Sequence, residues 1–103
     1  MITTISTRVY NQDQSWYFQR TVEIKARGNK KHTLRVNIRR NAYDNQSYAK
    51  VERWNGTEWK NVVNAPITEC ECKSVSYVQN GITERHFEKD SDRLVQEAES
   101  IVA

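Results

Sequence analysis

The strongest constraint on the fold is a pair of alternating segments joined by a short turn. In residues 16–27 and again in residues 33–40, apolar side chains alternate with polar ones. The apolar positions are Val22, Ile24 and Ala26 in the first segment and Leu34, Val36 and Ile38 in the second. Alternation with a period of two is typical of strands that bury one face. Because Gly28-Asn29-Lys30-Lys31 favours a turn, the two segments predict a β-hairpin.

The first of these strands contains one interruption. Trp16 and Phe18 are in the same alternating phase as Val22. Arg20, which occupies the position of this phase between Phe18 and Val22, is charged. A charged residue in the apolar phase indicates a β-bulge or a strand end near Arg20.

A second hairpin is expected at Asn55-Gly56, because both residues tolerate positive φ. Its strands are predicted over residues 47–54 and 58–63. One face carries Ala49, Val51 and Val62, and the other carries Tyr48, Trp54 and Trp59. The pattern leaves open which face is buried. The two tryptophans either stabilise the hairpin by pairing across it or present an aromatic anchor at an interface.

The C-terminal residues predict a helix that begins at Asp90 or Ser91 as N-cap and runs to about Val102. Its apolar stripe consists of Leu94, Val95, Ala98, Ile101 and Val102. Residues 66–79 favour a second helix beginning at Pro66, although a strand fits them as well. The sequence therefore predicts a single α+β domain over residues 1–103. Its antiparallel sheet has about four strands in two hairpins, with one or two helices packed on one face.

The charges are segregated along the chain. Residues 20–40 carry eight basic side chains and one acid, a net of +7, whereas the residues after Lys60 carry four bases and eight acids. On the predicted sheet, alternate basic residues of neighbouring strands point to one face, and a polyanion would relieve their repulsion. The candidate partner-binding residues are Lys25, Arg27, Lys30, Lys31, Arg35, Arg39, Arg40 and Tyr17, and a possible aromatic interface is formed by Tyr48, Trp54 and Trp59.

Two simpler interpretations compete with partner binding. Lysines on an exposed strand protect a sheet against edge-to-edge aggregation. Acids from the second half of the chain could also fold over the patch and neutralise it, the candidates being Glu69, Glu71, Glu84, Glu88, Glu97 and Glu99. A net of +7 exceeds what edge protection requires. Lys25, Arg27, Arg35 and Arg39 are therefore expected to project together into solvent without compensating carboxylates.

Catalytic and metal-binding motifs are not recognisable. Cys70 and Cys72 are too close in sequence to bond to each other readily, and no further ligands follow at zinc spacing, so both are expected as free thiols. His86 and Glu88 match part of a zinc-deaminase signature, but the required P-C-x-x-C is missing. A histidine paired with one of the cysteines would lack an oxyanion site. We therefore expect no enzyme activity, no cofactor and no metal.

The resulting hypothesis is a small non-catalytic binding protein whose basic sheet face engages nucleic acid or a ribonucleoprotein. No known nucleic-acid motif is present, so affinity for negative charge is expected rather than base-specific readout. The alternative is an inhibitor or adaptor, of the kind that phages and mobile elements carry, that blocks a larger complex such as a CRISPR defence system through an acidic protein surface. Without a signal peptide or an apolar span, the chain is expected in the cytoplasm and away from membranes. A homodimer through a sheet edge or the aromatic face is a further expectation.

Overall fold

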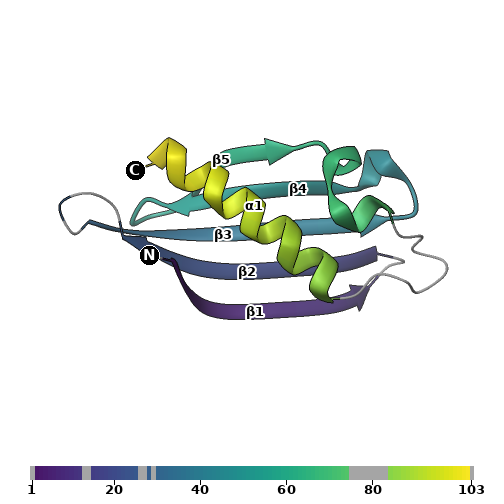
Figure 1. The fold of residues 1–103 in the computed structure, drawn as a ribbon, viewed down its shortest axis with the longest axis horizontal. Helices are drawn as coiled ribbons and strands as arrows, with labels where there is room; N and C mark the ends of the chain where they lie inside the picture. The colour runs from purple at the N-terminus through teal and green to yellow at the C-terminus, as the bar shows by residue number, and fades with distance from the viewer. Residues whose placement is uncertain (1, 13–14, 26–27, 29, 75–83, 103) are drawn as a thin grey trace.

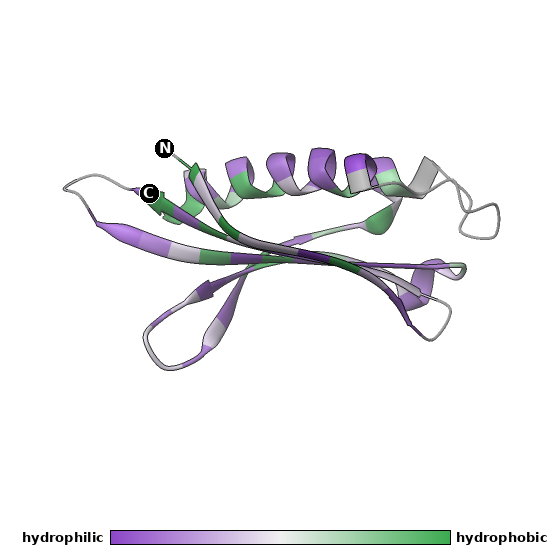
Figure 2. Cartoon of the chain, turned by 90° about the horizontal axis from the view of Figure 1, so that it is seen from below, coloured by the Kyte–Doolittle hydropathy of each residue, from purple (hydrophilic) through white to green (hydrophobic). Residues whose placement is uncertain are grey.

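A computed structural model describes residues 2–12, 15–25, 28, 30–74 and 84–102. Within these residues, five antiparallel strands form one sheet in sequence order (Figure 1). The strands are β1 (Ile2–Gln12), β2 (Ser15–Lys25), β3 (Lys31–Asn41), β4 (Tyr48–Trp54) and β5 (Trp59–Ala65). The helix α1 (Glu84–Val102) crosses one face of the sheet diagonally (Figures 1 and 2). The α+β class is confirmed, with one strand more than expected.

The predicted hairpin is present as β2 and β3. Val22 lies opposite Leu34, and Phe18 lies opposite Ile38. The bulge or strand end expected near Arg20 is not found in β2, since this strand pairs with β3 without interruption and Arg20 lies opposite Val36. The irregularity is instead in β1, between Thr4 and Ser6.

The core lies between α1 and the apolar side of the sheet. Val22, Ile24, Leu34 and Val36 are fully buried there. The rings of Phe18 and Phe87 stack in parallel, with centroids 5.6 Å apart, and so join β2 to α1. A register shift between β4 and β5 places Val63 opposite Val51 in the core.

The helix begins earlier than the sequence suggested. α1 is already formed at Glu84, so the expected N-caps Asp90 and Ser91 lie within it, and both are buried. The Asp90 carboxylate accepts hydrogen bonds from the backbone N–H groups of Glu71 (2.6 Å) and Cys72 (3.0 Å). Asp90 therefore caps a neighbouring turn instead of its own helix. The hydrogen bonds from this turn satisfy the buried carboxylate oxygens.

Residues 66–74 form short 3₁₀ turns, so the expected helix from Pro66 is not formed there. The turns are η3 (Ile67–Glu69) and η4 (Glu71–Ser74), and a third turn, η2 (Asp44–Gln46), connects β3 to β4. The remainder of the ambiguous segment, residues 75–79, lies outside the described residues.

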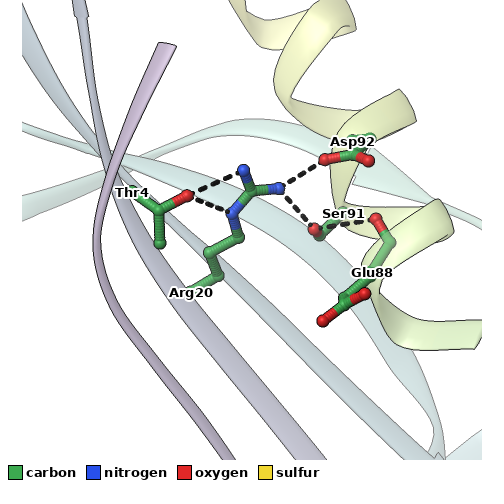
Figure 3. A network of polar contacts seen from close by, with 5 residues as sticks. All are labelled: Thr4, Arg20, Glu88, Ser91 and Asp92. Carbon is green, nitrogen blue, oxygen red and sulfur yellow. Dashed lines mark hydrogen bonds and ion pairs between the residues drawn. The ribbon is translucent and has the colours of Figure 1, made fainter. Parts of the chain in front are cut away.

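Arg20 explains why a charged residue occupies the apolar phase of β2. Its guanidinium donates to Thr4 Oγ1 from Nε (3.0 Å) and Nη2 (2.9 Å) (Figure 3). Its Nη1 donates to Ser91 Oγ at 2.9 Å and to Asp92 Oδ1 at 2.6 Å. One side chain of β2 thus ties the outer strand β1 to α1.

Replacing Arg20 with Gln is expected to lower the free energy of unfolding by about 1–2 kcal/mol, because charge-assisted hydrogen bonds are lost on both sides of the guanidinium. The ion pair itself contributes little, since the Asp92 side chain is 62% exposed. Urea unfolding measures the loss, and faster amide exchange in β1 would accompany it. Asp92→Asn keeps a hydrogen-bond acceptor and is the control. An equal loss in that variant would contradict the hydrogen-bond explanation.

Candidate nucleic-acid interface

The face of the sheet opposite α1 carries alternate side chains of all five strands, and we call it the open face. In the described chain no α-helix covers it (Figure 2). Residues directly opposite one another in antiparallel strands point to the same side. The register of the strands therefore places Tyr10, Tyr17, Arg39 and Tyr48 in one line across β1, β2, β3 and β4.

Planar groups stack along this line. The rings of Tyr10 and Tyr17 are nearly parallel, at 12°, with centroids 5.0 Å apart. The guanidinium of Arg8 lies 4.5 Å from the centre of the Tyr10 ring, and that of Arg39 lies 5.6 Å from the centre of the Tyr17 ring. The four groups form what we call the stacked row: Arg8, Tyr10, Tyr17 and Arg39. Guanidinium groups held over aromatic rings remain charged and exposed to anions.

A hollow of about 260 Å³ lies beside the stacked row. It is lined by Arg8, Tyr10, Tyr17, Phe18, Gln19, Asn37, Ile38 and Tyr48. Gln19 Nε2 donates to Asn37 Oδ1 at 2.9 Å, which fixes both amides at one side of the hollow. A volume below about 300 Å³ is too small for a drug-sized ligand but suits one planar ring. Aromatic walls with amide groups at the edge match the chemistry of a nucleobase.

Tyr48 forms one wall of the hollow and is a neutral hydrogen-bond donor. The pKa of its phenol is raised, mainly by partial burial and secondly by the neighbouring Tyr17. Lys50 Nζ lies 5.3 Å from the centre of the Tyr48 ring. Arg39 Nε donates to Ser15 Oγ at 3.0 Å, and this bond directs Arg39 toward Ser15 and away from the amides.

The charge of the open face is partly compensated by a residue that the sequence analysis did not consider. Glu52 Oε1 in β4 accepts hydrogen bonds from Arg35 Nη2 (3.1 Å) and Asn37 Nδ2 (2.7 Å). The expectation that Arg35 projects without a carboxylate partner is therefore wrong. The acids expected to act as a cover belong to the C-terminal half, whereas Glu52 is the cross-strand neighbour of Arg35.

The other predicted basic residues are divided between locations. Lys25 and Lys31 lie opposite each other in β2 and β3, at the far end of the open face. There Lys31 Nζ forms an ion pair with Glu23 at 3.6 Å. Lys30 is exposed, and Arg27 lies outside the described residues. Arg40 does not belong to this surface, because its side chain points to the helix side and is only 5% exposed. Its Nη1 donates to the backbone carbonyl of Asn41.

Despite these corrections, the described part of the open face is positively charged. It carries six cations and two acids, a net of +4. The cations are Arg8, Lys25, Lys31, Arg35, Arg39 and Lys50, and the acids are Glu23 and Glu52. Sequence reasoning missed Arg8, Tyr10 and Lys50. The first two lie in an unrecognised strand, and the charge of Lys50 cancels when charges are summed along residues 41–60.

In the hairpin formed by β4 and β5, the face of β4 that carries Ala49 and Val51 is the buried one. Ala49 and Val51 are in the core, so Tyr48 and Trp54 belong to the open face. Trp54 and Trp59 pair across the hairpin with centroids 5.4 Å apart, and Trp54 remains 41% exposed. The Arg35 guanidinium lies 4.2 Å from the centre of a Trp59 ring. The pair thus stabilises the hairpin and also adds aromatic surface to the open face.

The two cysteines lie on the opposite side of the molecule, beside α1. Both are free and buried. The hydrogen bond with Cys70, burial and the Asp90 carboxylate raise the pKa of Cys72, which therefore stays protonated. A protonated, buried thiol is a poor nucleophile. Within the described residues, no group of three or more His, Cys, Asp or Glu side chains could hold a metal ion.

Comparison of the chain with protein-family models, curated proteins and solved structures returns no match. No helix in the described part of the chain is long and apolar enough to cross a membrane.

Proposed function

We propose that this protein binds single-stranded nucleic acid across the open face. The observation that carries the proposal is the stacked row beside its hollow. Arg8, Tyr10, Tyr17 and Arg39 combine fixed cations with aromatic planes. Proteins that bind single strands use the same two elements, because bases stack on aromatic rings while cations follow the phosphates.

A single strand fits this surface better than a duplex. The aromatic rings and the amides of Gln19 and Asn37 are useful only to a base whose face and edge are free. In a duplex, bases are stacked on one another, and their major-groove edges are reached by a protruding helix or ribbon. The open face presents a broad sheet, and α1 lies on the other side (Figure 2).

The phosphate contacts are expected from Arg8, which lines the hollow, and from Arg39 and Lys50, which lie near the rings of its lining residues Tyr17 and Tyr48. None of the three cations has a carboxylate partner among the described residues. For single strands the logarithm of the binding constant falls with the logarithm of salt concentration, with a slope of about −0.7 per phosphate. Three contacts therefore predict a slope of about −2. Fluorescence anisotropy with labelled RNA and DNA strands of roughly 10 nucleotides measures it. Absence of binding to every strand at low salt would refute the proposal.

Tyr48→Ala is expected to weaken single-strand binding by about 5- to 150-fold, since one base–aromatic stack contributes about 1–3 kcal/mol. The same anisotropy titration measures the change. Tyr43→Ala is the matched control, because Tyr43 lies in the β3–β4 connection, is 64% exposed and does not line the hollow. Equal losses in the two variants would contradict a role for the hollow.

The second candidate function is an inhibitor or adaptor that docks the same face on an acidic protein surface. The specific observation in its favour is the clustering of Trp, Tyr and Arg, the residue types that dominate protein–protein hot spots. Exposed Trp54 and Tyr48 are the expected anchors. A stoichiometric complex that survives nuclease treatment, together with an absence of oligonucleotide binding, would favour this function over the first.

A further inference from the structure

The two edges of the sheet differ in their protection against pairing with another strand. β5 has only seven residues, carries Lys60, is irregular where it pairs with β4 and is followed by Pro66. Short length, lysine, irregular pairing and proline all block edge-to-edge association. β1 has eleven residues and a single charged side chain, Arg8, with neither lysine nor proline. Among the described residues its backbone is paired on one side only, with β2.

The faces of β1 are also largely uncovered. α1 packs mainly on β2, β3, β4 and β5. Most side chains of β1 are exposed, including Ile5, at 58%. Isoleucine, threonine and valine make up most of the strand, and these residues favour strand pairing. A long, β-prone edge with one charged side chain is a template for a further strand.

The bulge in β1 determines which part of this edge is regular. The register with β2 shifts between Thr4 and Ser6 and is then continuous through residues 6–12. A second copy of the same segment can pair along its whole length only in one symmetric antiparallel register, in which opposite residue numbers sum to 18. That register places Val9 on the two-fold axis, opposite Val9 of the second copy. Arg8 then lies opposite Tyr10, and Ser6 opposite Gln12.

Side-chain chemistry favours this register over its neighbours. An axis at Arg8 would place two guanidinium groups opposite each other, which is unfavourable. An axis at Thr7 would extend the pairing across the bulge. With the axis at Val9, each Arg8 meets the Tyr10 ring of the other copy, in the same kind of contact that it already makes within its own chain at 4.5 Å. Val9 itself is partly buried against the core and would gain an apolar neighbour.

We propose that β1 is a homodimerisation edge at which two copies pair antiparallel about Val9. Opposite residues share a face, so the two open faces would join into one continuous surface across the paired strands. The two copies of Arg8 and Tyr10 would lie at its centre. The dimer stands on the geometry of β1 alone, whereas a doubled nucleic-acid surface rests on the function proposed above.

Cross-linking tests the register directly. Val9→Cys brings two sulfurs together at the axis, because opposite Cα atoms in antiparallel strands are about 4.5–5.5 Å apart, within the range of a disulfide. Thr7→Cys is the matched control, since in this register Thr7 lies opposite Asn11 and the two copies of residue 7 are about 14 Å apart. Mild oxidation is expected to give a covalent dimer of Val9→Cys and little of Thr7→Cys. The unsubstituted chain controls for Cys70 and Cys72, which are buried.

Sedimentation of the unsubstituted chain provides the second measurement. The mass is expected to rise with concentration from 12.1 kDa toward twice that value. Val9→Lys, which places two ammonium groups at the axis, is expected to keep the chain monomeric. A monomer at every concentration, or equal cross-linking of both cysteine variants, would overturn the inference. Oligonucleotide titration of the same samples separates the two proposals, because a dimer that binds no nucleic acid refutes only the proposed function.

Discussion

Simultaneous replacement of Arg8, Arg39 and Lys50 with Glu is expected to weaken single-strand binding by at least about 100-fold. The three reversals change the net charge of the described open face from +4 to −2, since each removes a positive charge and adds a negative one. Phosphate contacts are thereby replaced with repulsion. Anisotropy titration of a labelled single strand at about 0.1 M salt measures the loss.

The matched control reverses three cations away from the open face. Arg85, Lys89 and Lys60 are exposed, and their replacement with Glu alters the total charge of the protein by the same amount. Because exposed charges beyond a Debye length of about 10 Å are screened at 0.1 M salt, this variant is expected to lose much less affinity. Equal losses would mean that binding follows total charge and that the open face has no particular role.

The strands that could be predicted from the sequence are those with one buried and one partly exposed face. β2 and β3 alternate because one face of each packs under α1 while the other is partly exposed, and their register with Val22 opposite Leu34 follows from that alternation. β1 was missed for the converse reason. Neither of its faces is deeply buried, so no alternating pattern marks it as a strand.

The errors in the candidate site have a common physical origin. Burial of Arg40 and pairing of Arg35 with Glu52 both depend on residues brought together by the sheet. A sum of charges along the sequence does not contain this information. The predicted role of Asp90 as N-cap of its own helix is wrong for the same reason. Its carboxylate oxygens accept hydrogen bonds from backbone N–H groups of η4, which is far away in sequence. Local patterns identified residues capable of these interactions, but not their partners.

Phe87→Ala is expected to lower the free energy of unfolding by about 3–5 kcal/mol, the usual cost of removing a buried phenylalanine ring. Phe87 is fully buried and stacks on Phe18, so the cavity would open between α1 and the sheet. Small domains are stable by only about 5–15 kcal/mol, so the loss is a large part of the total. Urea unfolding monitored by circular dichroism measures it.

Two further variants separate the cavity from the loss of apolar surface in general. Phe87→Leu refills most of the space and is expected to cost clearly less than Phe87→Ala. Ile101→Ala removes apolar atoms from a side chain that is 58% exposed and is expected to be nearly neutral. If all three variants lost similar stability, the Phe18–Phe87 contact would not be the main attachment of α1.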